Sequence, residues 1–332
     1  MMQISPETQL FIREHSSDDV RVLALQAKKY PDIDIPTAIT QIAGRKVAAE
    51  KIPSWWEIEK IWYPKHLSLE QCSSEITARY KARLLQGDSL TDLTGGFGID
   101  CSFLATGFKS ATYVERQEEL CEIAAHNFPV LNLNHINIKN EDGVTYLQAM
   151  SPVDCLFLDP ARRNEHGGKT VAISDCEPNV AELEELLLQK ANRVMIKLSP
   201  MLDLSLALKE LKQTQEVHIL SVNNECKELL ILLGQTSPTE ISIHCVNLST
   251  KGTQEEQHFV FTREQEQCSE CTYTDSLETY LYEPNASLLK AGAFRSIAAA
   301  YPVRKLHPNS HLYTSDTFIE NFPGRIFRIV NQ

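Results

Sequence analysis

The stretch Thr91-Asp92-Leu93-Thr94-Gly95-Gly96-Phe97-Gly98-Ile99-Asp100 leaves a short apolar segment, turns on three glycines within four residues and then enters a helical pattern. Glycines at a strand-to-helix turn let a ligand approach the backbone closely, as in nucleotide-binding sheets. Their spacing does not match G-x-G-x-x-G, the pattern that seats a pyrophosphate on a helix N-terminus in dinucleotide folds. Asp92 stands at the predicted strand end, so the turn suits a ligand with a positive amino group better than a phosphate.

Three further acids stand where later strands of the same region should end. Glu115 comes 23 residues after Asp92, where it would reach the ribose hydroxyls of a nucleoside. Asp142 follows the third predicted strand and would accept a hydrogen bond from an adenine amino group, and Asp159 ends the fourth. Ligands of open α/β sheets bind along the carboxyl edge of the strands. The four acids therefore favour an adenosyl ligand.

From Ser89 onward, short apolar runs alternate with amphipathic stretches. The predicted strands are SLTDLTG (89–95), ATYVERQ (111–117), DCLFLDP (154–160), RVMIKLS (193–199) and VHILSVN (217–223), with candidate helices at about 116–128 and 177–191. Strands spaced by one helix each indicate βαβ units, a mainly parallel sheet with helices on both faces, and an α/β fold. EISIHCVNL (240–248) and QHFVFTRE (257–264) alternate apolar and polar residues, which favours an antiparallel hairpin with one wet face.

The chain divides by pattern into three parts. Residues 1–85 have helix-period apolar spacing broken by prolines, which predicts a helical N-terminal domain. Residues 86–275 hold the α/β sheet and the hairpin. Residues 276–332 hold a helical stretch at 286–300 and strand-like pieces, which predict a small α+β unit. In the first part, Ser73 and Ser74 would cap either the following helix or a ligand pocket, and the aromatic group Trp55, Trp56, Trp62 and Tyr63 favours a core over base stacking.

Composition sets limits on partners and compartment. The chain has 332 residues, nine cysteines and a formal net charge of −12. No basic and apolar leader and no long apolar run is present, so we expect a cytoplasmic protein with reduced cysteines and no membrane partner. Basic residues outnumber acidic ones only at the ends, 12 to 11 in residues 1–85 and 6 to 2 in residues 286–332. Only the ends would favour an anionic partner such as RNA.

Four motifs in chain order, DLTGGFGID, YVER, NEDG and LDPAR, resemble motifs I to IV of class I S-adenosylmethionine (SAM)-dependent methyltransferases. The glycine turn and YVER resemble small-subunit ribosomal RNA guanine-N2 methyltransferases, and LDPAR is similar to the DPPR or DPAR segment of RNA 5-methyluridine methyltransferases. The resemblance implies a seven-stranded Rossmann-like methyltransferase sheet within 86–275 and SAM as cofactor. The residues that it implies for SAM binding are Asp92, Thr94, Gly96, Gly98, Asp100, Glu115, Arg116, Asp142, Gly143 and Asp159.

The whole chain resembles a bacterial methyltransferase family with a ferredoxin-like piece and then a THUMP-like domain after the catalytic domain. The segments that carry this resemblance are Ile42-Ala43-Gly44-Arg45, Pro53-Ser54-Trp55-Trp56, Glu70-Gln71-Cys72-Ser73-Ser74-Glu75 and Glu283-Pro284-Asn285-Ala286. It implies that residues 276–332 form the ferredoxin-like piece and that most or all of the THUMP-like part lies outside this sequence.

The fourth motif sets the expected chemistry. We expect in-line displacement at the sulfonium methyl, with Asp159 orienting the acceptor, the Pro160 carbonyl sharing that role and Arg162 or Arg163 gripping a phosphate of RNA. Residues 164–170, with two glycines, predict a lid over the acceptor. After the fifth predicted strand stands Lys197-Leu198-Ser199-Pro200 rather than a cysteine nucleophile, so covalent attack on a pyrimidine C5 is disfavoured. Lys197 itself is expected to pair with an acid or to reach the strand end.

Other functions stay open at this point. A nicotinamide-dependent oxidoreductase would use a similar sheet, although the glycine spacing and Asp92 count against it. A degenerate methyltransferase fold would serve as an RNA- or protein-binding module. The pair Cys268 and Cys271 is separated by 35 intervening residues from the pair His307 and His311, which is not the spacing of a zinc finger, so we expect no metal. The sequence leaves the oligomeric state open.

Overall fold

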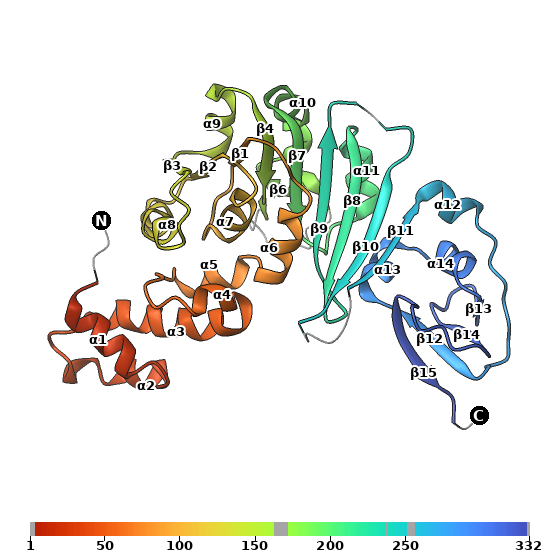
Figure 1. Ribbon diagram of the computed structural model, residues 1–332, viewed down its shortest axis with the longest axis horizontal. Coiled ribbons are helices and arrows are strands. Elements are labelled where there is room, and N and C mark those ends of the chain that lie inside the picture. Colours follow the sequence, from red (N-terminus) through yellow and green to blue (C-terminus); the bar gives the residue numbers. More distant parts are fainter. Residues whose placement is uncertain (1–3, 163–171, 237, 251–255, 331–332) are drawn as a thin grey trace. The chain divides into compact units, whose positions relative to one another are not determined.

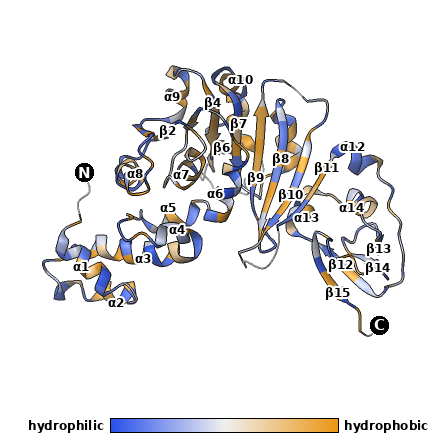
Figure 2. Cartoon of the chain, in the orientation of Figure 1, coloured by the Kyte–Doolittle hydropathy of each residue, from blue (hydrophilic) through white to orange (hydrophobic). Residues whose placement is uncertain are grey.

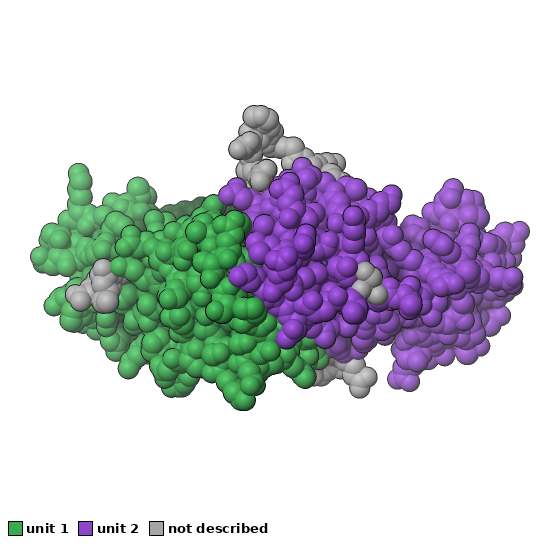
Figure 3. Space-filling model, turned by 90° about the horizontal axis from the view of Figure 1, so that it is seen from above, with its two compact units in different colours: residues 1–157 green, residues 158–332 purple. Residues whose placement is uncertain are grey.

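The computed structural model describes residues 4–162, 172–236, 238–250 and 256–330. The chain divides into two compact units, residues 1–157 and 158–332 (Figure 3). The finer division into domains at residues 85 and 275 stays a prediction.

The N-terminal part of unit 1 is helical, as predicted (Figure 1). Three of its prolines, Pro6, Pro36 and Pro53, stand in the first turn of a helix rather than merely interrupting one. Pro6 and Pro36 stand in the first turns of α1 and α3, where no backbone N–H partner is needed, and the side chains of Ser5 and Asp34 cap these two helices. The α1 and α2 helices pack on α3 around a small core of Phe11, Leu23, Ile35, Ala38 and Ile42. The elements are α1 (Pro6–Glu14), α2 (Val20–Leu25), the 3₁₀ turn η1 (Ala27–Lys29), α3 (Ile35–Lys51), α4 (Pro53–Trp56), α5 (His66–Gln71) and α6 (Glu75–Ala82).

The rest of unit 1 consists of strands that alternate with helices. Its strands run in the order β4–β1–β2–β3, and every pair is parallel. Asp92 pairs with Tyr113 and Phe157, and Glu115 pairs with Asn140, so the ends of these strands meet at one edge. The elements are β1 (Ser89–Asp92), α7 (Ile99–Ala105), β2 (Ser110–Glu115), α8 (Glu118–Val130), β3 (Ile136–Asn140), α9 (Gly143–Ala149) and β4 (Val153–Leu158).

The aromatic residues after α3 join the helical part of unit 1 to the glycine turn. Trp55 and Tyr63 are each 2% exposed and share one apolar cluster with Phe97, whose ring centroid lies 5.2 Å from that of Trp55. The core prediction is confirmed for these two residues. Trp56 is instead 41% exposed, and Trp62 stacks on His126 with 3.7 Å between ring centroids. The helical part thus supports the glycine turn by packing against Phe97.

Five strands of unit 2 pair in the order β11–β10–β8–β9–β7. The pair β8–β10 is parallel and the others are antiparallel, including the predicted hairpin of β10 and β11. With the four strands of unit 1 this makes two strands more than the seven that the resemblance implied, because the hairpin is additional. The elements are α10 (Val180–Lys190), β7 (Ala191–Leu198), α11 (Leu204–Glu210), β8 (Thr214–Val222), β9 (Glu225–Gly234), β10 (Ser242–Leu248), β11 (Gln257–Thr262) and α12 (Arg263–Cys268).

The strand β9 was not predicted. Its residues 228–233 are all buried, and Figure 2 shows it as apolar along most of its length. Asn223 and Asn224 connect it to β8 with φ angles of 50° and 65°, a left-handed pair typical of a tight hairpin turn. An Asn-Asn pair between two apolar runs was therefore the available signal.

The remaining elements of unit 2 are small. Residues after β4 form β5 (Ala161–Arg162), the 3₁₀ turn η2 (Ile173–Asp175) and β6 (Cys176–Glu177), and β5 pairs antiparallel with β6. The C-terminal part is an antiparallel sheet in the order β13–β14–β12–β15 with two helices, as predicted for a small α+β piece. Gly292, with φ of 76°, splits the predicted helical stretch 286–300 in two. The elements are β12 (Tyr280–Pro284), α13 (Ala286–Ala291), α14 (Arg295–Ala300), β13 (Arg304–Lys305), β14 (Tyr313–Ser315) and β15 (Gly324–Arg328).

The helices and the cysteines bear on where the protein can reside. None of the helices in the described ranges is long and apolar enough to cross a membrane. The cysteines are free thiols, and Cys101, Cys121, Cys155, Cys176 and Cys245 are buried.

Candidate functional site

The glycine turn between β1 and α7 leaves its backbone open on one side. Gly96 has φ of 54°, a left-handed conformation that other residues rarely adopt. A Cβ atom at this position would meet nothing nearer than the carbonyl oxygen of Thr94 at 3.8 Å. The turn then enters α7 at Gly98, which stands at the N-cap position. A ligand can therefore approach the main chain of Gly96 without a side chain in the way.

The carboxylates at the ends of β1 and β2 hold this turn. Asp92 Oδ1 accepts a hydrogen bond from the backbone N–H of Thr94 at 3.0 Å. Glu115 Oε2 accepts from the N–H of Gly96 at 2.9 Å, and its Oε1 accepts from the N–H of Gln117 at 2.8 Å. Both acids are buried, with 1% and 8% of their surfaces exposed. Because the two carboxylates grip the main chain, the shape of the turn depends on both.

The start of α9 closes the same edge from the side of β3. Asp142 is its N-cap residue and accepts through Oδ1 from the N–H groups of Val144 and Thr145, at 3.1 and 3.0 Å. Its side chain is otherwise exposed. Gly143 approaches the β1 end so closely that a Cβ there would lie 2.2 Å from the carbonyl oxygen of Leu93. Asp92, Gly96, Glu115, Asp142 and Gly143 are thus brought together in unit 1.

Asp100 has partners of a different kind. The Nζ atom of Lys81 in α6 lies 2.9 Å from Asp100 Oδ1, and Ser73 Oγ donates to Asp100 Oδ2 at 2.7 Å. Lys81 also donates to Ser73 Oγ at 2.9 Å, and its side chain is fully buried. The three side chains join α6 to α7 behind the turn, and sequence reasoning did not find this network.

The two remaining predicted SAM-binding residues of unit 1 lie near the turn. Thr94 is half-buried within it. The side chain of Arg116 is exposed, and its carbonyl oxygen accepts from Asn140 Nδ2 at 3.2 Å. Arg116 therefore takes part in the edge through its main chain.

The predicted acceptor residues belong to unit 2. Asp159 follows β4, and its carboxylate lies 2.6 Å from Nζ of Lys197, which β7 holds with 8% of its side chain exposed. The prediction that Lys197 pairs with an acid is confirmed. The Asp159 side chain is 38% exposed, and Pro160 beside it is buried. The main chain of Arg162 lies in β5, whereas its side chain, Arg163 and the predicted lid 164–170 lie outside the described residues.

Comparison with solved structures identifies the family. The crystal structure of a "putative methyltransferase" from Porphyromonas gingivalis W83 matches 100% of this chain and 84% of its own, with 34% sequence identity and a TM-score of 0.85. The chain belongs to this methyltransferase family. Residues 280–323 of the methyltransferase also match the model of a ferredoxin-like domain family. No curated protein matches it in sequence.

Two further solved structures match part of the chain. An rRNA methylase from Streptococcus thermophilus covers 48% of the methyltransferase and 93% of its own chain, with 14% identity and a TM-score of 0.35. A "putative methyltransferase" from Streptococcus mutans, solved in complex with SAH, covers 48% and 96%, again with 14% identity and a TM-score of 0.35.

A second group of polar side chains was missed from the sequence. Glu216, His218 and His244 of unit 2 place one ligand-type atom each within 4.8 Å of one another. Glu216 and His218 are two residues apart on a strand, which puts them on one face, and this spacing was the signal available. In the described ranges, Cys268, Cys271, His307 and His311 belong to no such group.

Proposed function

We propose that the methyltransferase takes its methyl group from SAM, bound at the glycine turn, and transfers it to a nitrogen atom of an RNA base. The observation that carries the proposal is the open main chain of Gly96 beside the carboxylates of Asp92 and Glu115. A turn without a side chain, next to two acids, fits an adenosyl group with a cationic amino acid tail.

Each acid in unit 1 has a part of SAM that its chemistry fits. Asp92 would hold the amino group of the methionine moiety, since a buried carboxylate prefers a cationic partner. Glu115 would accept from the ribose hydroxyls, and Asp142 would accept from the adenine amino group through its exposed side. Asp100 already has Lys81 and Ser73 as partners, so its part is to support α7 behind the turn.

The acceptor side rests on Asp159 and Pro160. SAM, when bound, supplies an electrophilic methyl group for in-line attack. Phe157 pairs with Asp92, and Asp159 follows two residues later in the chain. Its carboxylate would accept a hydrogen bond from the attacking N–H and orient the nitrogen lone pair. Lys197 keeps the carboxylate in place, and the carbonyl of Pro160 offers a second acceptor.

RNA is the proposed acceptor for reasons of charge and family resemblance. Residues 286–332 carry 6 basic and 2 acidic residues in a chain of net charge −12. This end would attract a phosphate backbone that the acidic middle repels. Arg162 would add a phosphate contact near Asp159.

Calorimetric titration with SAM and with S-adenosylhomocysteine tests the cofactor site. We expect micromolar binding to the natural chain and at least about tenfold weaker binding for Asp92→Ala and for Glu115→Ala. Asp88→Ala is the matched control, because Asp88 is an exposed acid that pairs with Lys109 in the same unit. Absence of binding to the natural chain, or a fluorescence change with NADH instead, would overturn the proposal.

Transfer of labelled methyl groups tests the acceptor. The methyltransferase and labelled SAM are incubated with cellular RNA, DNA or protein, and label in RNA alone is the expected result. Label in protein would overturn the RNA acceptor but keep the cofactor. SAM binding without label in any acceptor would favour a binding module that has lost turnover.

A further inference from the structure

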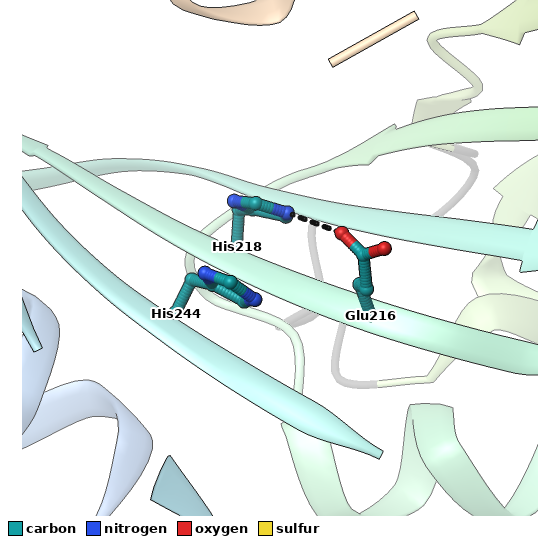
Figure 4. Close-up of side chains that lie close together, drawn as sticks. All are labelled: Glu216, His218 and His244. Atoms are coloured by element: carbon teal, nitrogen blue, oxygen red, sulfur yellow. Dashed lines mark hydrogen bonds and ion pairs between the residues drawn. The ribbon is translucent and has the colours of Figure 1, made fainter. Parts of the chain in front are cut away.

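Three side chains on one face of the strands of unit 2 converge without a part in the proposed methyl transfer. Glu216 and His218 lie on β8, and His244 lies on β10 directly opposite His218 in the parallel register. Side chains that are opposite across a parallel pair, or two residues apart on one strand, share a face. Figure 4 shows the two imidazole rings stacked, each with a nitrogen directed to the side where Glu216 lies.

The ligand-type atoms of the three side chains lie close enough together to share one ion after a small movement. His218 Nε2 lies 3.3 Å from Glu216 Oε2, and the ring centroids of His218 and His244 are 4.3 Å apart with 15° between their planes. One ligand-type atom from each residue falls within 4.8 Å of the other two. His218 is 2% exposed, so its ring has little freedom to turn away.

We propose that Glu216, His218 and His244 bind a divalent transition-metal ion, with Zn²⁺ as the best match. Two imidazole nitrogens and one carboxylate oxygen form a set that Zn²⁺ uses with a water molecule in the fourth position. Ca²⁺ and Mg²⁺ prefer oxygen ligands and would find one carboxylate here. The ligand types therefore select the class of ion.

Neighbouring groups already orient two of the three ligands. Arg193 on β7 lies 2.8 Å from Glu216 Oε1, so the guanidinium holds one carboxylate oxygen while Oε2 faces His218. His258 Nε2 on β11 lies 3.2 Å from His244 Nδ1, which leaves the other ring nitrogen of His244 on the side of Glu216. Such outer contacts fix the orientation of metal ligands in proteins.

The protonation states near neutral pH also suit a metal. Burial, with the nearby rings of His218 and His258, lowers the pKa of His244 to about 4, so this imidazole is neutral at pH 7. The hydrogen bond from His218 lowers the pKa of Glu216 to about 2, with the charge of Arg193 acting in the same direction, so this carboxylate is ionised. Both shifts favour the deprotonated forms that metal ligands require.

Binding requires a small contraction of the set. Bonds from Zn²⁺ to nitrogen or oxygen are about 2.0–2.2 Å long, so two ligand atoms on one tetrahedral ion lie about 3.4 Å apart. His218 Nε2 and Glu216 Oε2 are already 3.3 Å apart, so it is the ligand atom of His244 that must move closer. The two rings would tilt out of their parallel stack to aim both nitrogens at one point. The ion would replace Ser242 Oγ, which lies 3.2 Å from His244 Nε2, as the partner of this nitrogen.

The test uses the untagged protein of residues 1–332 after treatment with a chelator and dialysis. Zn²⁺ alone is titrated in competition with a chromophoric chelator, and Co²⁺ alone is followed by its visible absorption. We expect one ion per chain, and affinity reduced more than about tenfold in His244→Ala and in Glu216→Gln. Arg193→Gln, which removes an outer contact only, should weaken binding by about tenfold.

Control variants test whether thiols and imidazoles outside this site bind the ion instead. His307→Ala and Cys268→Ser remove the exposed ligand types that the sequence first drew attention to, and we expect them to leave affinity unchanged. Far-UV circular dichroism and metal-free thermal unfolding of each variant show that the fold is intact. No bound ion, equal affinity in His244→Ala, or loss only in the His307 and Cys268 variants would each overturn the proposal.

Discussion

Two lysine–aspartate pairs in the chain have the same chemistry and different surroundings. Lys81 and Asp100 in unit 1 lie 2.9 Å apart, with 0% and 10% of their side chains exposed. Lys197 and Asp159 in unit 2 lie 2.6 Å apart, with 8% and 38% exposed. Both lysines are enclosed, and only the second acid is open to solvent. The two acids therefore differ in access: Asp100 is enclosed by protein, whereas a second partner can reach Asp159.

The energetic consequence differs between the pairs. Removing one partner of an enclosed ion pair leaves an uncompensated charge, which costs about 3–5 kcal/mol. Where the remaining acid is partly exposed, water solvates it and the cost falls. Ser73 adds a third member to the enclosed pair, so Asp100 has two protein donors, Lys81 and Ser73.

The largest expected effect is on the free energy of unfolding of Lys81→Met. We expect a loss of about 3–5 kcal/mol, because the Asp100 carboxylate stays buried without its cation. Urea unfolding followed by tryptophan fluorescence measures it, since Trp55, Trp56 and Trp62 all lie in unit 1. Lys65→Met is the control: its exposed pair with Glu119 should contribute at most about 1 kcal/mol. Equal losses in Lys81→Met and Lys65→Met would show that burial of an ion pair does not set its contribution to stability in this protein.

A double variant sharpens the same point. Lys81→Met with Asp100→Asn removes both charges, so its cost should be clearly smaller than the sum of the two single costs. Additive costs would mean that the two groups act independently and that the pair is not what holds α6 to α7.

The second effect is on catalysis by Asp159→Asn. We expect the rate of methyl transfer to fall by about 10²-fold, because the acceptor loses the group that orients it, while the affinity for SAM stays within a few fold. Labelled transfer and calorimetry measure the two quantities, and Asp275→Asn, an exposed acid far along the chain, serves as control. A large loss of SAM affinity would show that Asp159 belongs to the cofactor site instead.

The parts of the fold that the sequence predicted are those set by local pattern. The glycine turn, the strands that end in Asp92 and Glu115, and the β10–β11 hairpin each follow from residues close together in the chain. Alternation and βαβ spacing are local signals, and burial in the structure agrees with them. The mainly parallel order of unit 1 follows from the same spacing.

The parts that sequence did not predict depend on contacts between distant segments. Lys81 and Asp100 are 19 residues apart on two helices, and only the packing of α6 on α7 brings them together. His218 and His244 meet because β10 pairs in parallel with β8, a register that no local pattern encodes. The β9 strand was missed because a buried apolar run has no period.

The third effect links stability to catalysis in the open pair. Lys197→Met should lower the free energy of unfolding by about 1–2 kcal/mol, less than Lys81→Met, because Asp159 regains water as a partner. It should also lower the rate of methyl transfer by about tenfold, since the carboxylate loses its fixed position. Far-UV circular dichroism is the appropriate probe of unfolding, because unit 2 has no tryptophan. A stability loss as large as that of Lys81→Met would break the comparison.

The smallest effect concerns Ser73, the serine that contacts both members of the enclosed pair. Ser73→Ala removes a hydroxyl that donates to Asp100 and accepts from Lys81, so we expect a loss of about 1 kcal/mol and unchanged SAM affinity. Ser74→Ala is the matched control, since the neighbouring hydroxyl contacts Thr77 rather than the ion pair. Tryptophan fluorescence during urea unfolding reports both variants. If Ser73→Ala instead weakens SAM binding with stability unchanged, Ser73 caps the cofactor pocket, and the enclosed pair is then part of the site rather than its support.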